Sequence, residues 1–413
     1  MLQARTLSHA ACLAGLAIAS HAHAGALAVI ANYYDNTVSI VDIACRPSLA
    51  KPCAALATIP VGTHPYGVAT RADGSVAYVT NSWDNTVSII DVPHRTVMNT
   101  VPVGSLPYGV VVDSVSGTAY VSGLADHTVT VITAKHGAEA TISVPNPHGL
   151  AVSPDGKRLY AGDYGSGALT VIDTTAREVI GQVPVGGLPV GIAVHPSGSP
   201  VFVASFTNQS LVAVDAITLE VVGQVHAGTG AAGVALDPAG AFAYVANMDD
   251  NSVSVVRTAD MNVVATVPVG SNPVGISADP DGHFVHVANV FDNNLAVIDT
   301  DSRTVVANLP VGTSPYSHGA FITGIDDPRT RIVDLIGTLG IIDGKRNVTT
   351  PLTQFLRQAL AAYDRGNRVV ASERLVRFSD FVRKTRASRD IDAATATLLQ
   401  RDAETATSML RSR

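Results

Sequence analysis

The stretch PYGVATRADGSVAYVTNSWDNTVSIIDVPHRTVMNTVPVG, residues 65–104, determines the fold, because variants of it occur seven times between Leu27 and Thr323. The shared pattern is Pro-x-Gly-Val-Ala, an Asp-Gly turn, Ala-Tyr-Val-x-Asn, Asn-Thr-Val-Ser-Val-Ile-Asp and Val-Pro-Val-Gly. Its first glycine recurs at steps of 42, 40, 42, 42, 42 and 44 residues, at Gly67, Gly109, Gly149, Gly191, Gly233, Gly275 and Gly319. Repeats of about 40–45 residues with four short strands each are typical of β-propeller blades.

Each repeat predicts four strands. In the quoted copy the run after Gly67 is the first strand, and Ala77-Tyr78-Val79 lies in the second. Thr86–Ile90 alternates polar and apolar residues as the third, and Thr96–Val103 is the fourth. Asp-Gly and Asp-Asn pairs supply the turns between them.

The two ends of the array predict a closed ring. The first copy begins in mid-repeat at Leu27–Asn32, continues with Thr37–Ile43, and lacks a preceding Pro-x-Gly strand. That missing strand is present at the far end, as His318–Thr323. Three strands from the N-terminal side and one from the C-terminal side complete a blade and hide both sheet edges. With six internal blades, this composite blade makes an all-β propeller of seven.

The repeated Tyr78-Val79-Thr80-Asn81 motif, with Asn-Thr-Val-Ser and Val-Pro-Val-Gly around it, resembles the YVTN family of bacterial and archaeal seven-bladed propellers. The resemblance extends over roughly Leu27 to Thr323. It implies that the Pro-x-Gly strand is the innermost one and that ligands bind at one end of the central channel. Relatives of this kind include surface-layer proteins, periplasmic binding proteins and propeller domains of redox enzymes.

The N-terminal residues 1–24 are typical of a secretion signal. Arg5 provides the basic start, Ala10–Ser20 the apolar stretch, and Ala22-His23-Ala24 the small-x-small cleavage site. The apolar stretch is too short to span a bilayer. We therefore expect a periplasmic or secreted mature protein without a transmembrane segment; retention of the N-terminus in the membrane is the alternative.

Cys45 and Cys53 are the only cysteines left after cleavage, and they flank a short insertion between two strands of the composite blade. Two cysteines across one loop of an exported protein predict a disulfide. The alternative, a metal site, lacks a nearby histidine or third cysteine.

Charge is unevenly distributed along the chain. Residues 25–327, the predicted propeller, carry 10 Lys and Arg against 25 Asp and Glu, for a net charge of −15. Residues 328–413 carry 16 against 9, for +7. The acidic ring disfavours nucleic acid as a partner.

The C-terminal residues 328–413 predict a small all-α domain. Thr350-Pro351 marks a helix start with proline at its first position, and Gly366 ends that helix. A second apolar stripe runs from Ala371 to Val382, and a third begins at Ile391. The pattern leaves open whether these helices bundle alone, dock on the acidic propeller or bind a partner. A shorter helix is expected over 330–339.

Aromatic residues gather in two sets of loops: those leading into the innermost strands and those joining the second and third strands. Since loop aromatics are not needed for a core, we interpret them as a face that binds a protein or a small molecule. The alternative is that each Pro-Tyr pair packs locally against the next blade. The predicted ligand-binding residues are Tyr34, Tyr66, Trp83, Tyr108, His148, Tyr164, Phe206, Phe291, Tyr316 and His318.

Histidines occur in the same loops, at His64, His127, His148 and His318. Two or three imidazoles meeting at the channel would suit zinc, copper or iron, but single histidines at varied positions are the simpler interpretation. No cofactor is predicted. Asp163, which replaces the repeat asparagine, is the one acid in these loops that departs from the pattern.

The sequence contains no Cys-x-x-Cys-His haem motif, no Gly-x-Ser-x-Gly elbow and no glycine-rich phosphate loop before a helix. The favoured hypothesis is therefore an exported, non-enzymatic binding or scaffolding propeller. The alternative is a metal-dependent enzyme, a lyase or lactonase or an oxidoreductase-associated propeller, that uses histidines at the channel mouth.

Overall fold

The computed structural model describes residues 26–43 and 55–323, except 73, 134 and 136, and residues 346–387, except 366. It also describes single C-terminal positions, namely 332, 335, 336, 396, 399, 400, 403, 404, 406 and 407. The predicted signal at 1–24 and the predicted Cys45–Cys53 disulfide lie outside these residues.

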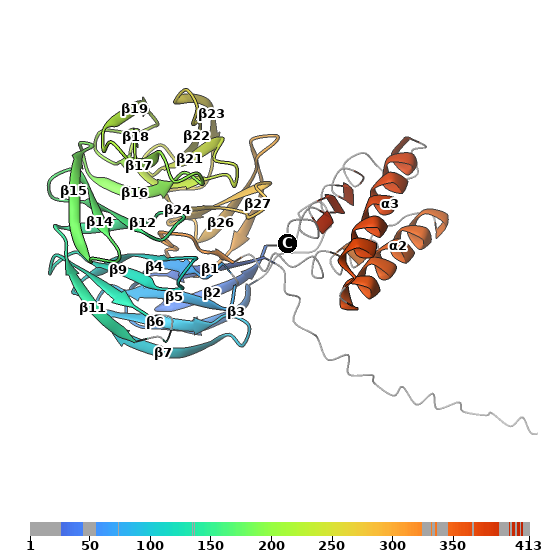
Figure 1. Ribbon diagram of the computed structural model, residues 1–413, viewed down its shortest axis with the longest axis horizontal. Coiled ribbons are helices and arrows are strands. Elements are labelled where there is room, and N and C mark those ends of the chain that lie inside the picture. Colours follow the sequence, from blue (N-terminus) through green and yellow to red (C-terminus); the bar gives the residue numbers. More distant parts are fainter. Residues whose placement is uncertain are drawn as a thin grey trace, which may run out of the picture.

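Within the described residues, seven four-stranded antiparallel sheets confirm the predicted propeller (Figure 1). Six of the sheets are each formed by four strands consecutive in sequence, of which the first is innermost and the last outermost. They are β4 (Pro65–Thr70), β5 (Val76–Asn81), β6 (Thr86–Asp91) and β7 (Thr96–Pro102); β8 (Pro107–Val112), β9 (Ala119–Gly123), β10 (Thr128–Ile132) and β11 (Ala138–Ser143); β12 (Pro147–Val152), β13 (Arg158–Asp163), β14 (Ala168–Asp173) and β15 (Glu178–Pro184); β16 (Pro189–Val194), β17 (Val201–Ser205), β18 (Ser210–Val214) and β19 (Val221–His226); β20 (Ala231–Leu236), β21 (Phe242–Asn247), β22 (Ser252–Arg257) and β23 (Asn262–Pro268); β24 (Pro273–Ala278), β25 (Phe284–Asn289), β26 (Asn294–Asp299) and β27 (Thr304–Pro310).

The seventh sheet is the composite blade, with strand order β28 (Ile322–Thr323), β1 (Leu27–Asn32), β2 (Thr37–Asp42) and β3 (Ala55–Pro60). The predicted closure by three strands and one is thus confirmed, but β28 is shorter than the expected His318–Thr323. The reason is a positive φ at Ser317 (45°) and Gly319 (112°), which takes the backbone out of the extended conformation.

The segment before β28 links the composite blade to its neighbour. The Val29 amide donates to the carbonyl of Phe321 at 2.9 Å, which joins the segment to β1. The Val68 amide on β4 donates to the carbonyl of His318, also at 2.9 Å. One short segment therefore ties the two blades on either side of the ring closure.

Seven glycines let the inner strands approach one another. A Cβ on Gly67 would overlap the carbonyl oxygen of Tyr108 on the next blade, and one on Gly109 would overlap that of His148. The same relation continues through Gly149, Gly191, Gly233 and Gly275 to Gly319, which meets the carbonyl of Val68 and closes the circle. The repeated glycine is therefore required by close backbone approach at the channel.

The asparagine of the YVTN motif holds the loops at one end of the ring. Asn81 is fully buried, and its side-chain NH₂ donates to Thr86 Oγ1 and Ser88 Oγ, both at 2.9 Å. Its Oδ1 accepts from the Gly62 amide at 3.1 Å, which anchors the loop that leads into β4. Asn32 makes the same three bonds in the composite blade, where Gly312 is the amide donor. The motif thus fixes the loops that form the mouth of the channel.

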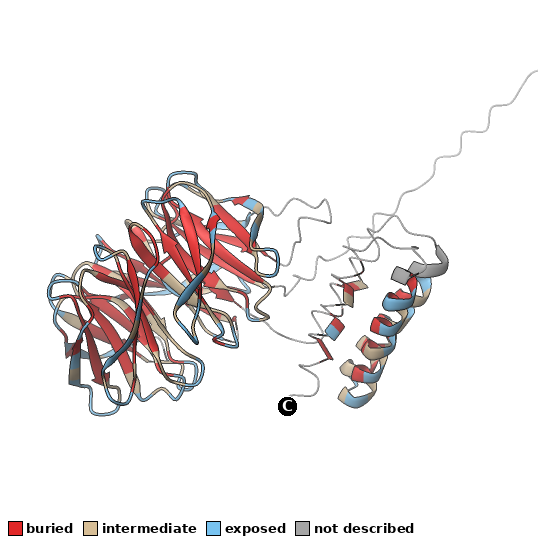
Figure 2. Cartoon of the chain, turned by 90° about the horizontal axis from the view of Figure 1, so that it is seen from above, coloured by how far each residue is buried: buried red, intermediate tan, exposed pale blue. Residues whose placement is uncertain are grey.

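The core consists of apolar side chains packed between neighbouring blades. Four strand tyrosines belong to this core and are at most 5% exposed, namely Tyr78, Tyr120, Tyr160 and Tyr244. Figure 2 shows buried inner strands and exposed turns at both ends of the propeller.

The C-terminal segment contains α2 (Arg346–Asp364) and α3 (Arg368–Ala387). α2 begins before the predicted Thr350-Pro351 start, so Pro351 lies inside the helix. Only one backbone hydrogen bond is lost at this position near the helix start, which explains why the helix extends past it. Phe378 and Leu375 belong to an apolar core that also includes the helical positions Ile332 and Leu399. No described helix is long and apolar enough to cross a membrane.

Candidate binding site at the channel mouth

In each blade, the residue just before the repeated glycine of the inner segment lines one end of the channel. In order around the ring these residues are His318, Tyr66, Tyr108, His148, Val190, Ala232 and Val274. All seven line a cavity of about 390 Å³. Six blades therefore contribute one side chain from their inner strand to the same cavity, and the composite blade contributes His318 from the segment before β28.

The loops that join second and third strands supply an outer layer. The first residue of each loop lines the cavity in five blades, as Tyr33, Leu124, Tyr164, Phe206 and Met248. Tyr34 and Tyr316 complete the lining. None of the fourteen lining residues is an acid, a lysine or an arginine.

One half of the cavity wall is a continuous set of aromatic rings. Tyr66 stacks on His318 at 5.2 Å and 9°, and on Tyr316 at 4.8 Å and 25°. Tyr108 stacks on His148 at 5.0 Å, and Tyr66 meets Tyr108 edge-on at 4.6 Å. These contacts immobilise the rings before a ligand arrives, so the wall is preorganised.

The opposite half is apolar. Val190, Ala232 and Val274 occupy the same motif position as the tyrosines, and Phe206 and Met248 lie in the outer layer beside them. The cavity therefore has a polar aromatic wall and an aliphatic wall facing each other.

Two histidines of the wall are neutral at neutral pH. Burial lowers the pKa of His148 to about 4, although a backbone hydrogen bond with Val190 raises it. Burial, together with repulsion from His148, lowers the pKa of His318 to about 3. His148 is 7% exposed, and its Nδ1 has no hydrogen-bond partner.

The tyrosines of the wall are also kept neutral. Burial raises the pKa of the Tyr66 phenol well above its usual value, and the neighbouring Tyr316 raises it further. Burial likewise raises the pKa values of Tyr108 and Tyr316. Each phenol keeps its proton and can donate or accept a hydrogen bond.

The structure brings two of the four loop histidines together, with the rings of His148 and His318 5.9 Å apart. His64 instead stacks on Tyr33 and meets Trp83 edge-on, and His127 Nδ1 accepts from the Asn146 amide at 3.3 Å. Among the described residues, no three His, Cys, Asp or Glu side chains come together as a metal site.

Eight of the ten predicted site residues line the cavity; Trp83 and Phe291 do not. Both are the second residue of their loop, in the two blades whose first loop residue does not line the cavity, and they are 65% and 71% exposed. The sequence prediction rests on aromatic residues and histidines, so it misses the aliphatic lining residues. Their repeat position, which they share with the predicted residues, is the signal that identifies them. These aliphatic residues are Val190, Ala232, Val274 and Leu124; Tyr33 and Met248 also line the cavity and are outside the ten predicted residues.

Asp163 has a structural role in its own turn. Its carboxylate accepts from the Ser166 hydroxyl at 2.6 Å, the Gly165 amide at 2.9 Å and the Asn146 side chain at 3.1 Å. Burial raises its pKa, but these hydrogen bonds outweigh that effect and lower it overall. It does not line the cavity.

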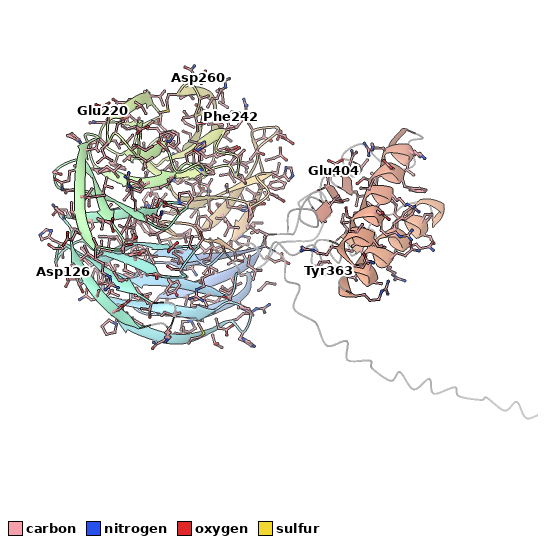
Figure 3. The ribbon with its side chains drawn as sticks, in the orientation of Figure 1. Asp126, Glu220, Phe242, Asp260, Tyr363 and Glu404 are labelled. Atoms are coloured by element: carbon pink, nitrogen blue, oxygen red, sulfur yellow. The ribbon has the colours of Figure 1, made fainter. Side chains whose placement is uncertain are left out.

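The loops around the mouth are acidic. The seven loops into the inner strands and the seven between second and third strands contain no Lys or Arg. They contain six aspartates, all of them exposed, namely Asp35, Asp84, Asp126, Asp249, Asp250 and Asp292. Asp126 is labelled in Figure 3.

A family model described as "Lactonase, 7-bladed beta-propeller" matches residues 214–309. This part of the propeller is similar to that family model. The match covers the blades β20–β23 and β24–β27, on the apolar side of the cavity. No curated protein matches the chain.

Solved structures resemble the chain at low identity. Hydrazine synthase of Kuenenia stuttgartiensis is 21% identical, with a TM-score of 0.57 over 61% of this chain and 88% of that one. A putative 6-phosphogluconolactonase from Bacteroides fragilis is 16% identical, with a TM-score of 0.60 over 71% and 97%. A functionally unknown protein from Desulfotomaculum acetoxidans is 15% identical, with a TM-score of 0.60 over 71% and 99%. At these identities the likeness concerns the fold alone.

Proposed function

We propose that this protein is an exported binding protein that holds a small organic molecule in the channel mouth. The observation that carries the proposal is the 390 Å³ cavity, with a preorganised aromatic wall facing an aliphatic one. Its volume lies within the range of about 300–1,000 Å³ found for small-molecule sites. A small molecule with one apolar face and a few polar atoms would complement both walls.

Ligand recognition would depend on the rings nearest the channel. Tyr66 and Tyr108 are held by their neighbours, so little conformational entropy is lost when they contact a ligand. Truncating an aromatic side chain at the centre of a site to alanine typically weakens binding by about 2 kcal/mol or more. Trp83 lies outside the cavity and would contribute less.

The test is native mass spectrometry of protein isolated after export. A small molecule that co-purifies with the wild type is expected to be lost from the Tyr66→Ala/Tyr108→Ala variant. It should be retained by Trp83→Ala and by Lys157→Ala, whose residue lies at the opposite end of the channel. The proposal fails if the double variant retains the molecule or if Lys157→Ala loses it.

A second candidate is hydrolysis of a lactone, which the family match to residues 214–309 favours. Neutral His148, which lines the cavity, could take a proton from an attacking water. A phosphorylated lactone is disfavoured, because neither the cavity wall nor the mouth loops hold a cationic side chain.

Two measurements separate these candidates. Acid release from a panel of unphosphorylated lactones, abolished in His148→Gln, would establish the hydrolase. Elemental analysis of untagged protein tests whether the hydrolase would depend on a metal. A stoichiometric transition metal would favour a metal-dependent enzyme over a binding protein.

A further inference from the structure

The rim of the cavity is acidic at positions directly beside the lining residues. Asp35 follows Tyr34, and Asp249 follows Met248, both of which line the cavity. Asp84 and Asp292 accept hydrogen bonds from the amides of Thr63 (2.5 Å) and Ser271 (2.8 Å). These bonds hold the carboxylates in place, and no lysine or arginine in the mouth loops neutralises them.

Elsewhere in the propeller, the acidic side chains are accompanied by basic ones. All ten lysines and arginines of residues 25–327 lie outside the mouth loops. Some of them pair with acids there, as Arg177 does with Glu139 at 3.1 Å and Arg257 with Asp260 at 2.8 Å. The mouth loops therefore hold six aspartates with no cationic side chain among them, and this negative charge attracts cations to the cavity.

The wall below this rim suits a cation in two further ways. The electron-rich faces of tyrosine rings attract a positive charge, most strongly where water is excluded. In addition, the His148 ring lines the cavity and carries no positive charge at pH 7 that would repel a cation, because burial lowers its pKa to about 4.

From these observations we infer that the ligand is a small organic amine bound in its ammonium form, with an apolar body. Its charged nitrogen lies among Tyr66, Tyr108 and His148, and its body lies against Val190 and Val274. This inference rests on the proposed function and specifies the chemistry of that same site.

The test compares three probes of one shape by calorimetry on the full mature protein at pH 7 and low salt. They are 2-phenylethylamine, which is cationic, 2-phenylethanol, which is neutral, and phenylacetate, which is anionic. We expect the amine to bind at least about tenfold more tightly than the alcohol, and phenylacetate not to bind. The Tyr66→Leu substitution should weaken binding of the amine more than binding of the alcohol.

Charge variants isolate the contribution of the rim. The Asp35→Asn/Asp84→Asn/Asp292→Asn protein keeps an oxygen acceptor at each position but loses three charges. It should bind the amine about three- to tenfold more weakly, with the alcohol unaffected, and the difference should disappear at high salt. The matched control is Asp173→Asn/Asp260→Asn/Asp301→Asn at the other end, which should leave amine binding unchanged.

Equal binding of amine and alcohol, or tighter binding of the alcohol, would overturn the ammonium assignment and leave the channel-mouth binding function standing. Absence of binding by all three probes would also overturn it. The proposed function is judged separately, by whether a co-purifying molecule depends on Tyr66 and Tyr108.

Discussion

Gly67 shows how a single residue type controls the approach of neighbouring blades. Its Cα faces the Tyr108 carbonyl so closely that a methyl group would overlap it, and six other glycines stand in the same relation. Backbone atoms of the adjacent blade cannot move aside as a flexible side chain can. Each of these positions therefore tolerates only glycine, although most have ordinary φ values.

We predict that Gly67→Ala lowers the free energy of unfolding by about 3 kcal/mol, since overpacking against backbone strains both blades. Gly137→Ala is the matched control, because a Cβ there meets nothing within 4 Å. That control should change stability by less than about 0.5 kcal/mol. Guanidinium denaturation of both variants measures the difference, and equal stabilities would contradict the close-approach argument.

His148 makes stability depend on pH. Its pKa is about 4 in the folded protein and about 6.5 in the unfolded chain, so between these values the unfolded state binds more protons. Stability then falls as pH drops from about 6.5 to 4, by on the order of 3 kcal/mol for this residue.

Denaturation of the wild type and of His148→Gln at pH 7 and pH 4.5 tests this. The loss of stability on acidification should be smaller in the variant, which removes the titrating group. If both proteins lose the same amount, His148 is protonated equally in the folded and unfolded states. His318, whose pKa is about 3, should also lower the stability of the folded protein as the pH falls.

At the scale of elements, the composite blade is where the ring closes. Three N-terminal strands and the short β28 form its sheet, and Phe321 just before β28 is fully buried in the core shared with β1 and neighbouring blades. The closure therefore relies on packing as well as on the few hydrogen bonds of a two-residue strand.

We predict that Phe321→Ala destabilises the protein by about 3–5 kcal/mol, because it leaves a cavity at the closing blade. Phe291→Ala makes the same chemical change at a side chain that is 71% exposed, and should cost less than about 0.5 kcal/mol. Thermal unfolding distinguishes the two. A Phe321→Ala protein that melts with the wild type would contradict closure by this segment.

Cys45 and Cys53 lie between β2 and β3 in the sequence. A disulfide between them would constrain the connection between these two outer strands of the closing blade. We predict that they are oxidised in the exported protein, and that Cys45→Ser/Cys53→Ser lowers stability by about 2–3 kcal/mol. Intact-mass measurement after alkylation without reductant checks the bond; incorporation of two alkyl groups would refute it.

At the scale of the whole molecule, the described apolar clusters divide into two sets. Those of the propeller contain only residues 27–322, whereas the cluster around α2 and α3 contains only residues from 332 onwards. The two parts thus have separate cores, and we expect a core change in one to leave the other folded.

Phe378 is fully buried in the helical core. Phe378→Ala is expected to lower the temperature at which the helical signal at 222 nm is lost. The fluorescence of Trp83, the single tryptophan of the chain, reports the propeller and should keep its wild-type transition. A joint shift of both signals would mean that the two cores unfold together.

Local pattern was sufficient for the fold. The 42-residue period, the alternation within each strand and the half-repeats at both ends predicted seven blades and the composite closure, because strand pairing within a blade depends on nearby residues. The predicted boundaries of β28 and α2 differ from those in the structure. They depend on the backbone conformation at single residues, which the apolar pattern does not encode.

The amino-acid sequence by itself thus determined the propeller, its closing blade and the face on which aromatic side chains gather. Only the tertiary structure decided which of those side chains meet: it placed Tyr66 and His148 in one wall, and Trp83 and Phe291 outside the cavity. It also set Val190 and Val274 opposite the tyrosines. The physical reason is that the site takes one residue from each blade, and ring closure rather than any local pattern sets where those residues point.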